Sequence, residues 1–201
     1  MEINAAQVKE LREGTGAGVM ECKKALQEAQ GDTDKAVRLL REKGLAGARK
    51  KAGRSAADGI IDAYIHLNNR IGVLLEVNCE TDFVARNEIF RAMVHDVAMH
   101  IAAASPLYVS SEDIPEVVFE QEREINRNRA LKEGKPEKVV DKIVEGRMKK
   151  YYEEVCLLDQ PFVRDPEITV GEVVQRTIAA VGENIIVRRF ARFQVGESLP
   201  E

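Results

Sequence analysis

The stretch IIDAYIHLNNRIGVLLEVN, residues 60–78, decides the fold of this chain. Apolar side chains occupy every second position in both halves, which is the period of a β-strand with one buried face. The NNR between them predicts a tight turn, so the two halves should pair as an antiparallel hairpin. The faces that we expect to be buried carry Ile61, Ala63, Ile65 and Leu67 on the first strand and Val73, Leu75 and Val77 on the second.

After the hairpin the apolar period becomes that of α-helices. The first of these helices carries an apolar stripe and stops before Pro106. The second and third are joined by KEGKP, whose Gly134 and Pro136 force the reversal of a helical hairpin. A short helix and a last strand close the chain. These elements are expected at residues 83–104 (stripe Phe90, Val94, Val97 and Ile101), 115–131, 137–154, 169–180 and 183–197.

Before the hairpin, the first 44 residues predict three short helices separated by glycine. Asn4 can cap the first helix, with Gln7 three residues later as in a capping box. The third helix is expected to start near Asp32 and to end before Gly44. The apolar stripe of the second helix carries Val19, Met20, Cys22, Ala25, Leu26 and Ala29.

The domain organisation follows from these elements. The segment LAGARKKAGRSAADG, residues 45–59, lacks a clear apolar face and is expected to be a connecting helix or linker. Helices and strands are segregated along the chain, which is typical of the α+β class. We therefore predict a three-helix bundle with its linker over residues 1–54. An α+β core with a small antiparallel sheet packed against helices is predicted over residues 55–201.

Composition limits the classes of function. Apolar residues make up 44% of the chain, no run approaches 18 apolar residues, and the N-terminus lacks the apolar segment of a signal peptide. We therefore expect a cytoplasmic protein with no membrane partner. The net charge of -4 argues against direct nucleic-acid binding, which needs a basic stripe. Three widely separated cysteines predict neither a disulfide framework nor a zinc site, and no metal or cofactor is expected.

Several local patterns have a chemical interpretation and a plainer one. GTGAG at residues 14–18 follows a helix instead of a strand, so a helix-to-helix turn is favoured over a phosphate loop. His95 and His100 lie about 140° apart around a helix and cannot share a metal. RMKKYY at residues 147–152 lies among acids, which favours a solvated helix face over a nucleic-acid patch. Cys79 has little nearby to activate it, which favours a buried structural thiol.

The segment ETDFVARNEIF, residues 80–90, lies where the strand pattern gives way to the helix pattern. Thr81 or Asp82 can cap the helix through a side-chain oxygen. Phe83 is harder to explain, because a first-turn residue at such a junction tends to project outward. Its large apolar side chain either folds back into the core or belongs inside another protein, and the residues alone leave both possibilities open.

Four segments of the chain, in order, resemble those of the elongation factor Ts family, the guanine-nucleotide exchange factors for elongation factor Tu. The junction and the strand before it, RIGVLLEVNCETDFVARNEIF, resemble a signature of that family. The resemblance covers nearly the whole chain. The other three segments are VKELREGTGAGVMECKKALQEAQGD (8–32), VEGRMKKYYEEVCLLDQPFVRDPEITVGEVV (144–174) and RRFARFQVGE (188–197).

The resemblance implies an exchange factor without covalent chemistry, which binds elongation factor Tu in its GDP-bound and nucleotide-free forms. Asp82 and Phe83 would be pushed between two helices of the G domain, near its magnesium and phosphate site. The bundle would resemble a ubiquitin-associated domain and dock on the G domain, and the shortness of the chain implies a homodimer. The contact residues implied are Thr81, Asp82, Phe83, Val84, Ala85 and Arg86, together with Arg12, Val19 and Met20.

Two other classes of function stay open from the residues. The first is an adaptor, in which the bundle binds a peptide or a ubiquitin-like surface and the core only forms a dimer. The second is an enzyme whose site is assembled from distant residues such as Asp82 and His95. An adaptor would bind elongation factor Tu without accelerating the release of GDP, whereas an exchange factor would accelerate it.

Overall fold

The computed structural model describes residues 3–198. Contacts between residues divide the chain into two compact units, and each is described by itself. Unit 1 comprises Met1–Asp62, Leu75–Asp96 and Glu172–Arg188, and unit 2 comprises Ala63–Leu74, Val97–Gly171 and Arg189–Glu201. The domain boundary at residue 54 stays a prediction.

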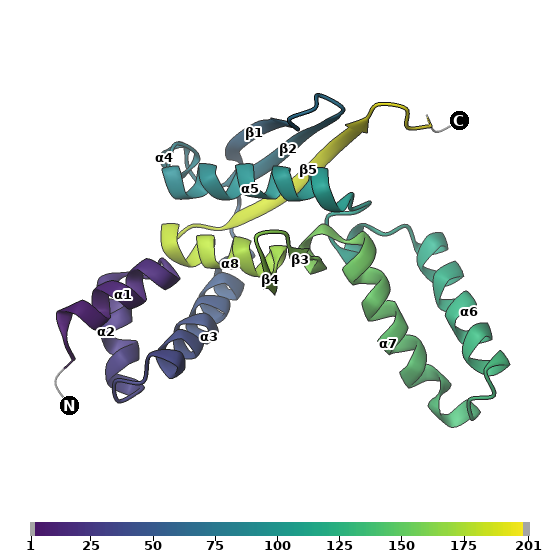
Figure 1. Ribbon diagram of the computed structural model, residues 1–201, viewed down its shortest axis with the longest axis horizontal. Coiled ribbons are helices and arrows are strands. Elements are labelled where there is room, and N and C mark those ends of the chain that lie inside the picture. Colours follow the sequence, from purple (N-terminus) through teal and green to yellow (C-terminus); the bar gives the residue numbers. More distant parts are fainter. Residues whose placement is uncertain (1–2, 199–201) are drawn as a thin grey trace. The chain divides into compact units, whose positions relative to one another are not determined.

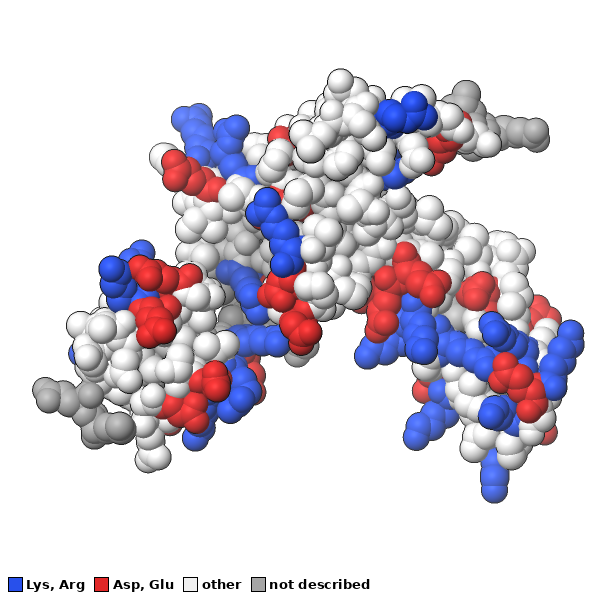
Figure 2. Space-filling view, in the orientation of Figure 1, with Lys and Arg blue, Asp and Glu red and all other residues white. Residues whose placement is uncertain are grey.

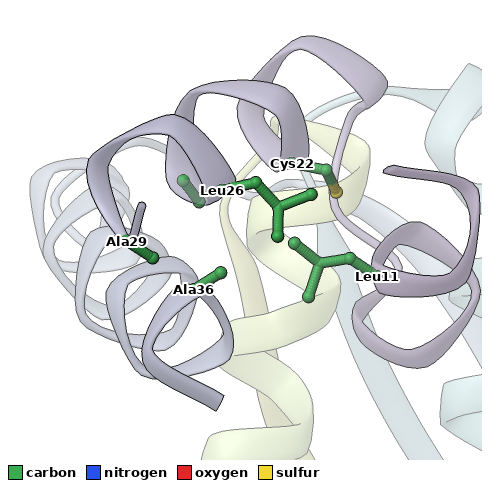
Figure 3. Close-up of a cluster of buried hydrophobic side chains, with 6 residues drawn as sticks. Leu11, Cys22, Leu26, Ala29 and Ala36 are labelled. Carbon is green, nitrogen blue, oxygen red and sulfur yellow. The ribbon is translucent and has the colours of Figure 1, made fainter. Parts of the chain in front are cut away.

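The N-terminal bundle consists of α1 (Ala5–Thr15), α2 (Val19–Glu28) and α3 (Thr33–Lys51). The predicted cap at Asn4 and the predicted start of the third helix near Asp32 are confirmed. Asn4 forms a capping box with Gln7, and the Asp32 side chain accepts a hydrogen bond from the Lys35 N–H at 2.9 Å. The three helices enclose a small apolar core (Figure 3), formed by the buried residues Leu11, Cys22, Ala25, Leu26, Ala29 and Ala36.

The helix α3 is longer than predicted, because it continues past Gly44 instead of ending before it. A Cβ atom at Gly44 would lie 3.6 Å from the Cβ of Ala179 in α8 (Val170–Val181), which is an ordinary van der Waals separation, so the extended part of α3 packs against α8. One turn earlier, Arg41 forms an ion pair with Glu172 of α8. These contacts within unit 1 offset the cost of a glycine inside a helix, about 1 kcal/mol relative to alanine.

The main sheet has the strand order β1-β2-β5, with β1 at Asp58–Ile65, β2 at Ile71–Cys79 and β5 at Ile185–Gln194. The predicted hairpin is confirmed. Asn69 in its turn has a φ of 54°, a left-handed conformation that asparagine tolerates well. On β2 the predicted face is buried, with Val73, Leu75 and Val77 each at most 1% exposed.

The prediction of the buried face of β1 was wrong. The His66 N–H donates to the backbone across the turn at 2.9 Å, and this register places Tyr64 opposite Val73. The side of β1 that shares the buried face of β2 is therefore the more polar side. A period of two identifies a strand but not which face is covered. The apolar residues predicted to be buried, Ile61, Ala63, Ile65 and Leu67, are all exposed in the single chain.

The helix predicted over residues 83–104 is two helices, α4 (Asp82–Ala85) and α5 (Glu88–Ala104). The interruption falls at Arg86 and Asn87. The Asn87 side chain accepts a hydrogen bond from the Ile89 N–H at 2.8 Å and so starts a new helix where the pattern suggested a continuous one. The predicted apolar stripe is confirmed, because Phe90, Val94, Val97 and Ile101 are fully buried.

Unit 2 contains the predicted helical hairpin, formed by α6 (Glu116–Lys132) and α7 (Glu137–Val155) (Figure 1). Figure 2 shows Lys and Arg intermixed with Asp and Glu over this hairpin. Within the RMKKYY segment, Arg147 donates to the Asn126 carbonyl at 3.3 Å and to Glu133 at 2.7 Å. The segment is a mixed-charge helix face and not a basic patch. The hairpin has its own buried cluster, Ala130, Val140, Val144 and Met148, against which Phe119, Ile143, Tyr151 and Tyr152 pack.

The remaining short elements were not predicted. They are the 3-10 helices η1 (Ser111–Asp113) and η2 (Leu157–Asp159) and the strands β3 (Pro161–Phe162) and β4 (Asp165–Thr169), which pair in antiparallel fashion. Segments of two to five residues are too short to show a period. The α+β class, with a three-helix bundle, a small antiparallel sheet and a helical hairpin, is confirmed. Within residues 3–198, no helix is long and apolar enough to cross a membrane.

Candidate partner-binding site

The junction between β2 and α4 holds a large aromatic side chain away from the protein. Phe83 is 81% exposed, whereas Val84 and Ala85 beside it are 8% and 6% exposed. The two buried side chains anchor the four-residue helix. The ring of Phe83 therefore does not fold back into the core of its own chain. It faces solvent, on a backbone that its buried neighbours hold in place.

Thr81 caps α4 and is held by a carboxylate that is distant in sequence. The Thr81 N–H donates to Glu183 Oε2 at 3.0 Å, and its hydroxyl donates to Glu183 Oε1 at 2.7 Å. The Glu80 N–H donates to Glu183 Oε2 at 3.2 Å. Three donors from two consecutive residues thus converge on one side chain just before Asp82 and Phe83.

In a second set of hydrogen bonds Glu80 supplies the acceptor, and the residue after Glu183 is a donor. Glu80 Oε1 accepts the Asn184 N–H at 2.6 Å and lies 3.5 Å from the Arg54 guanidinium. The Asn184 side chain, which is buried, donates to the carbonyls of Ala52 and Arg54 at 3.4 and 2.9 Å. The turn between α8 and β5, the end of β2 and the end of α3 are therefore joined by reciprocal polar contacts within unit 1.

Cys79 is the buried structural thiol that the sequence favoured. Its side chain is fully buried, and its Sγ donates to the Thr81 carbonyl at 3.2 Å. Burial, with the nearby carboxylates of Glu183 and Asp58, raises the pKa of Cys79 to about 11. A thiol with this pKa stays protonated at neutral pH, so Cys79 acts as a donor at the junction and not as a nucleophile.

The charged residues of the junction form one exposed ion pair. Arg86 Nη2 lies 3.0 Å from Asp82 Oδ2, one turn away, and both side chains are well exposed. An exposed pair of this kind contributes at most about 1 kcal/mol to stability. Asp82 can therefore exchange Arg86 for another partner at little cost.

The second predicted group lies at the turn between α1 and α2. Gly16 has a φ of 69° and donates its N–H to the Arg12 carbonyl at 2.8 Å, so it ends α1 in the left-handed conformation. Arg12, Val19 and Met20 are all exposed around this turn, with Val19 and Met20 at 50% and 63%. Val19 and Met20, which the sequence placed on the apolar stripe of α2, therefore lie outside the core of the bundle.

The residues of the enzyme alternative have different partners. Asp82 pairs with Arg86, while His95 Nδ1 lies 3.1 Å from Asp62 Oδ2. His100 is buried and lies beside Gln160, with its Nε2 2.9 Å from the Gln160 Oε1. Among residues 3–198, no group of three or more His, Cys, Asp or Glu side chains is arranged to hold a metal ion.

Sequence reasoning missed the residues that hold the junction. Glu183 and Asn184 lie more than 100 residues from the segment that they bind. Their only local signal is a position after Gly182, at the start of a strand. No fixed spacing could have linked them to Thr81, since the fold alone brings them together.

The junction thus presents an exposed aromatic ring on an anchored backbone. Comparisons with known proteins agree on the family of the chain. The family model described as Elongation factor TS matches residues 5–197. Elongation factor Ts of Acetivibrio thermocellus is 59% identical over 197 residues, covering 98% of this chain and 92% of its own.

Two further relatives named elongation factor Ts show the same extent of similarity. That of Thermoanaerobacter sp. is 60% identical over 197 residues, covering 98% of this chain and 97% of its own. That of Alkaliphilus oremlandii is 57% identical over 199 residues, covering 99% of this chain and 92% of its own. The chain belongs to the elongation factor Ts family, and its role is in translation elongation.

Proposed function

We propose that this protein promotes the release of GDP from elongation factor Tu, with Asp82 and Phe83 as the inserting element. The observation that carries the proposal is the 81% exposure of Phe83 on a backbone fixed by buried neighbours. An exposed phenylalanine on a rigid junction suits insertion into a partner, because little conformational entropy is lost when it binds. Val84 and Ala85 are buried, so they support the element from below instead of touching the partner.

The mechanism needs no covalent step. Mg²⁺ requires near-ideal octahedral geometry and bridges nucleotide phosphates to protein oxygens, so small displacements around it weaken nucleotide binding sharply. A ring inserted between two helices of a G domain displaces both helices. Asp82, released from Arg86, adds a negative charge beside the phosphates and disfavours their binding further.

The energy available from one ring sets the scale of the effect. Burying one phenylalanine side chain contributes about 1.5 to 3 kcal/mol. Each 1.4 kcal/mol corresponds to about a tenfold change in affinity. Phe83 therefore accounts for about 10- to 100-fold weakening of GDP binding, and other contacts must supply the rest. We assign some of these to Arg12, Val19 and Met20 of the ubiquitin-associated-like bundle, docked on the G domain.

Binding of this protein and of nucleotide must oppose each other reciprocally. A factor that lowers the affinity of elongation factor Tu for GDP has its own affinity lowered by GDP to the same extent. The same linkage applies to GTP with its magnesium ion. Rebinding of nucleotide therefore releases the factor, and the cycle requires no further energy source.

The test is the release of labelled GDP from purified elongation factor Tu. We expect this protein to accelerate release and Phe83→Ala to reduce the acceleration by at least about tenfold, in line with the burial energy of the ring. Because Phe83 is exposed, its replacement should change the free energy of unfolding by no more than about 0.5 kcal/mol. Ile125→Ala, at an exposed apolar position on α6, is the matched control and should leave release unchanged.

Two results would count against the proposal. Binding to elongation factor Tu without faster GDP release would support the adaptor alternative. A large loss of stability in Phe83→Ala, about 3 kcal/mol or more, would show that the ring belongs to the core in solution.

The homodimer is also a proposal, and exposed side chains of unit 2 support it. Ile65 on β1, Leu74 on β2 and Phe193 on β5 are 60%, 49% and 68% exposed, although all three lie on strands of one sheet. Exposed large apolar residues of this kind are typical of surfaces that another chain covers. The occupant that we propose for this surface is a second copy of the chain.

A further inference from the structure

The carboxylate of Glu183 accepts three hydrogen bonds from the two residues that precede the inserting element, Glu80 and Thr81. Its Oε2 accepts the N–H groups of Glu80 and Thr81 at 3.2 and 3.0 Å, and its Oε1 accepts the Thr81 hydroxyl at 2.7 Å. We propose that Glu183 is a positioning residue for nucleotide exchange, which sets the direction in which Phe83 leaves the protein. The inference rests on the proposed function and deepens it.

The chemistry of the contact explains why a carboxylate stands at this position. A carboxylate is an acceptor only, with room for several donors, and hydrogen bonds to an ionised acceptor are stronger than neutral ones. Here the donors are two consecutive backbone N–H groups and one hydroxyl. Fixing both N–H groups fixes the peptide plane between Glu80 and Thr81, and with it the start of α4.

The restraint passes from Thr81 into the helix that carries the ring. The Thr81 Oγ1, which donates to Glu183, also accepts the Val84 N–H at 3.5 Å. Val84 is buried and follows Phe83 directly. The ring therefore lies between two restrained positions, Thr81 before it and Val84 after it.

A side chain can position another only if it is held itself. The Asn184 N–H donates to Glu80, and the buried Asn184 side chain donates to the Ala52 and Arg54 carbonyls. The backbone that follows Glu183 is thus held by both the main chain and the side chain of Asn184. Without the carboxylate, the ring would keep its exposure but sample more directions, and a smaller fraction of the molecules would present it correctly to the partner.

The experiment measures GDP release from elongation factor Tu at saturating factor, for Glu183→Ala, Phe83→Ala and the double variant. Poor placement of one group can cost one to two orders of magnitude in rate, so we expect about a tenfold loss for Glu183→Ala. If Glu183 acts through Phe83, the double variant will be no slower than Phe83→Ala alone. A purely structural role predicts instead that the two losses multiply.

Two further variants separate positioning from folding. Glu183→Gln keeps one oxygen for the backbone N–H groups and should restore most of the rate. Thr81→Val removes the hydroxyl that donates to Glu183 and accepts the Val84 N–H, and it should reproduce part of the loss. Glu145→Ala, at an exposed acid on α7, is the control. The inference is overturned if Glu183→Ala, folded by circular dichroism and with an unchanged unfolding midpoint, accelerates release as well as the unmodified protein.

Amide hydrogen exchange of the free protein gives a readout that does not depend on exchange activity. We expect faster exchange at Glu80 and Thr81 in Glu183→Ala, since their N–H groups lose their acceptor. If the unmodified protein fails to accelerate GDP release, the proposed function fails. Unchanged amide exchange overturns the positioning role whatever the activity.

Discussion

At the scale of single residues, His100 shows how a buried polar side chain fixes its own protonation state. Its Nδ1 faces the Val163 N–H at 3.2 Å, and because a backbone N–H can only donate, Nδ1 carries no proton. Its Nε2–H then donates to Gln160 Oε1 at 2.9 Å, while the Gln160 amide group donates to the Glu154 carbonyl. His100 is therefore the neutral tautomer with the proton on Nε2.

This arrangement predicts a dependence of stability on pH. Burial lowers the pKa of His100 from its usual 6.5, although the hydrogen bond to Gln160 opposes the shift. The unfolded chain therefore takes up a proton first as the pH falls, so His100 contributes stability above about pH 6.5 that is lost progressively at lower pH. We expect the free energy of unfolding to fall more between pH 7.5 and 5.5 for the unmodified protein than for His100→Gln.

The measurement is urea denaturation at several pH values for both proteins. A substitution at a site this well buried will lower stability at every pH, so the slope with pH, not the absolute value, is the relevant quantity. Parallel curves for the two proteins would show that His100 is not the group responsible.

The residues of the site differ in how far the sequence revealed them. Phe83, Asp82 and Thr81 lie in one segment, and their order at a strand-to-helix junction was enough to single them out. Glu183 was missed because its relation to Thr81 exists only in the folded chain. Local chemistry is visible in a sequence, whereas a hydrogen bond across 102 residues is not.

At the scale of secondary-structure elements, two glycines in unlike settings give opposite predictions. Gly59 on β1 has a φ of 145°, and a Cβ there would lie 2.2 Å from the Val77 carbonyl oxygen. Gly146, inside α7, is exposed and has open space where a Cβ would lie. Gly59 is required because two strands approach each other closely there. Gly146 has no such neighbour and only lowers the stability of its helix.

We therefore expect Gly59→Ala to lower the free energy of unfolding by about 2 kcal/mol or more, since the clash is with backbone. Gly146→Ala should raise it by about 0.5 to 1 kcal/mol through helix propensity. Urea denaturation of both variants beside the unmodified protein provides the check. Equal effects of the two substitutions would show that the strand packing at Gly59 is looser than described.

The errors in the predicted elements share one physical cause. Periodicity reported the type of each long element correctly, from the bundle to the helical hairpin. It could not show that α3 runs past Gly44 to approach α8, or that Asn87 starts a new helix. It also assigned the wrong side of β1 to the interior. In each case a contact outside the local segment decided the outcome.

At the scale of the whole molecule, the exposed apolar side chains of the sheet lead to a prediction about assembly. We expect a homodimer at micromolar concentration, with or without reductant, because Cys22, Cys79 and Cys156 are buried and free. Leu74→Glu places a charge among exposed apolar residues and should shift the equilibrium toward monomer, since burying an unpaired charge is unfavourable. Light scattering gives the mass directly.

The control for assembly is Val117→Glu, an equally drastic change at an exposed position on α6. It should leave the mass unchanged. A monomeric mass for the unmodified protein would remove the dimer proposal but would leave the proposed role of Phe83 intact, because the inserting element lies within a single unit.

The burial of all three cysteines has a practical consequence for spectroscopy. Burial, with Asp159 and Asp113 nearby, raises the pKa of Cys156 to about 11, as burial does for Cys79. Maleimide dyes react with thiolates, so these native side chains will be labelled slowly at neutral pH. A single cysteine introduced at Ile125 on α6 can then carry a fluorophore in the otherwise natural sequence, and energy transfer to a labelled nucleotide would follow the encounter in real time.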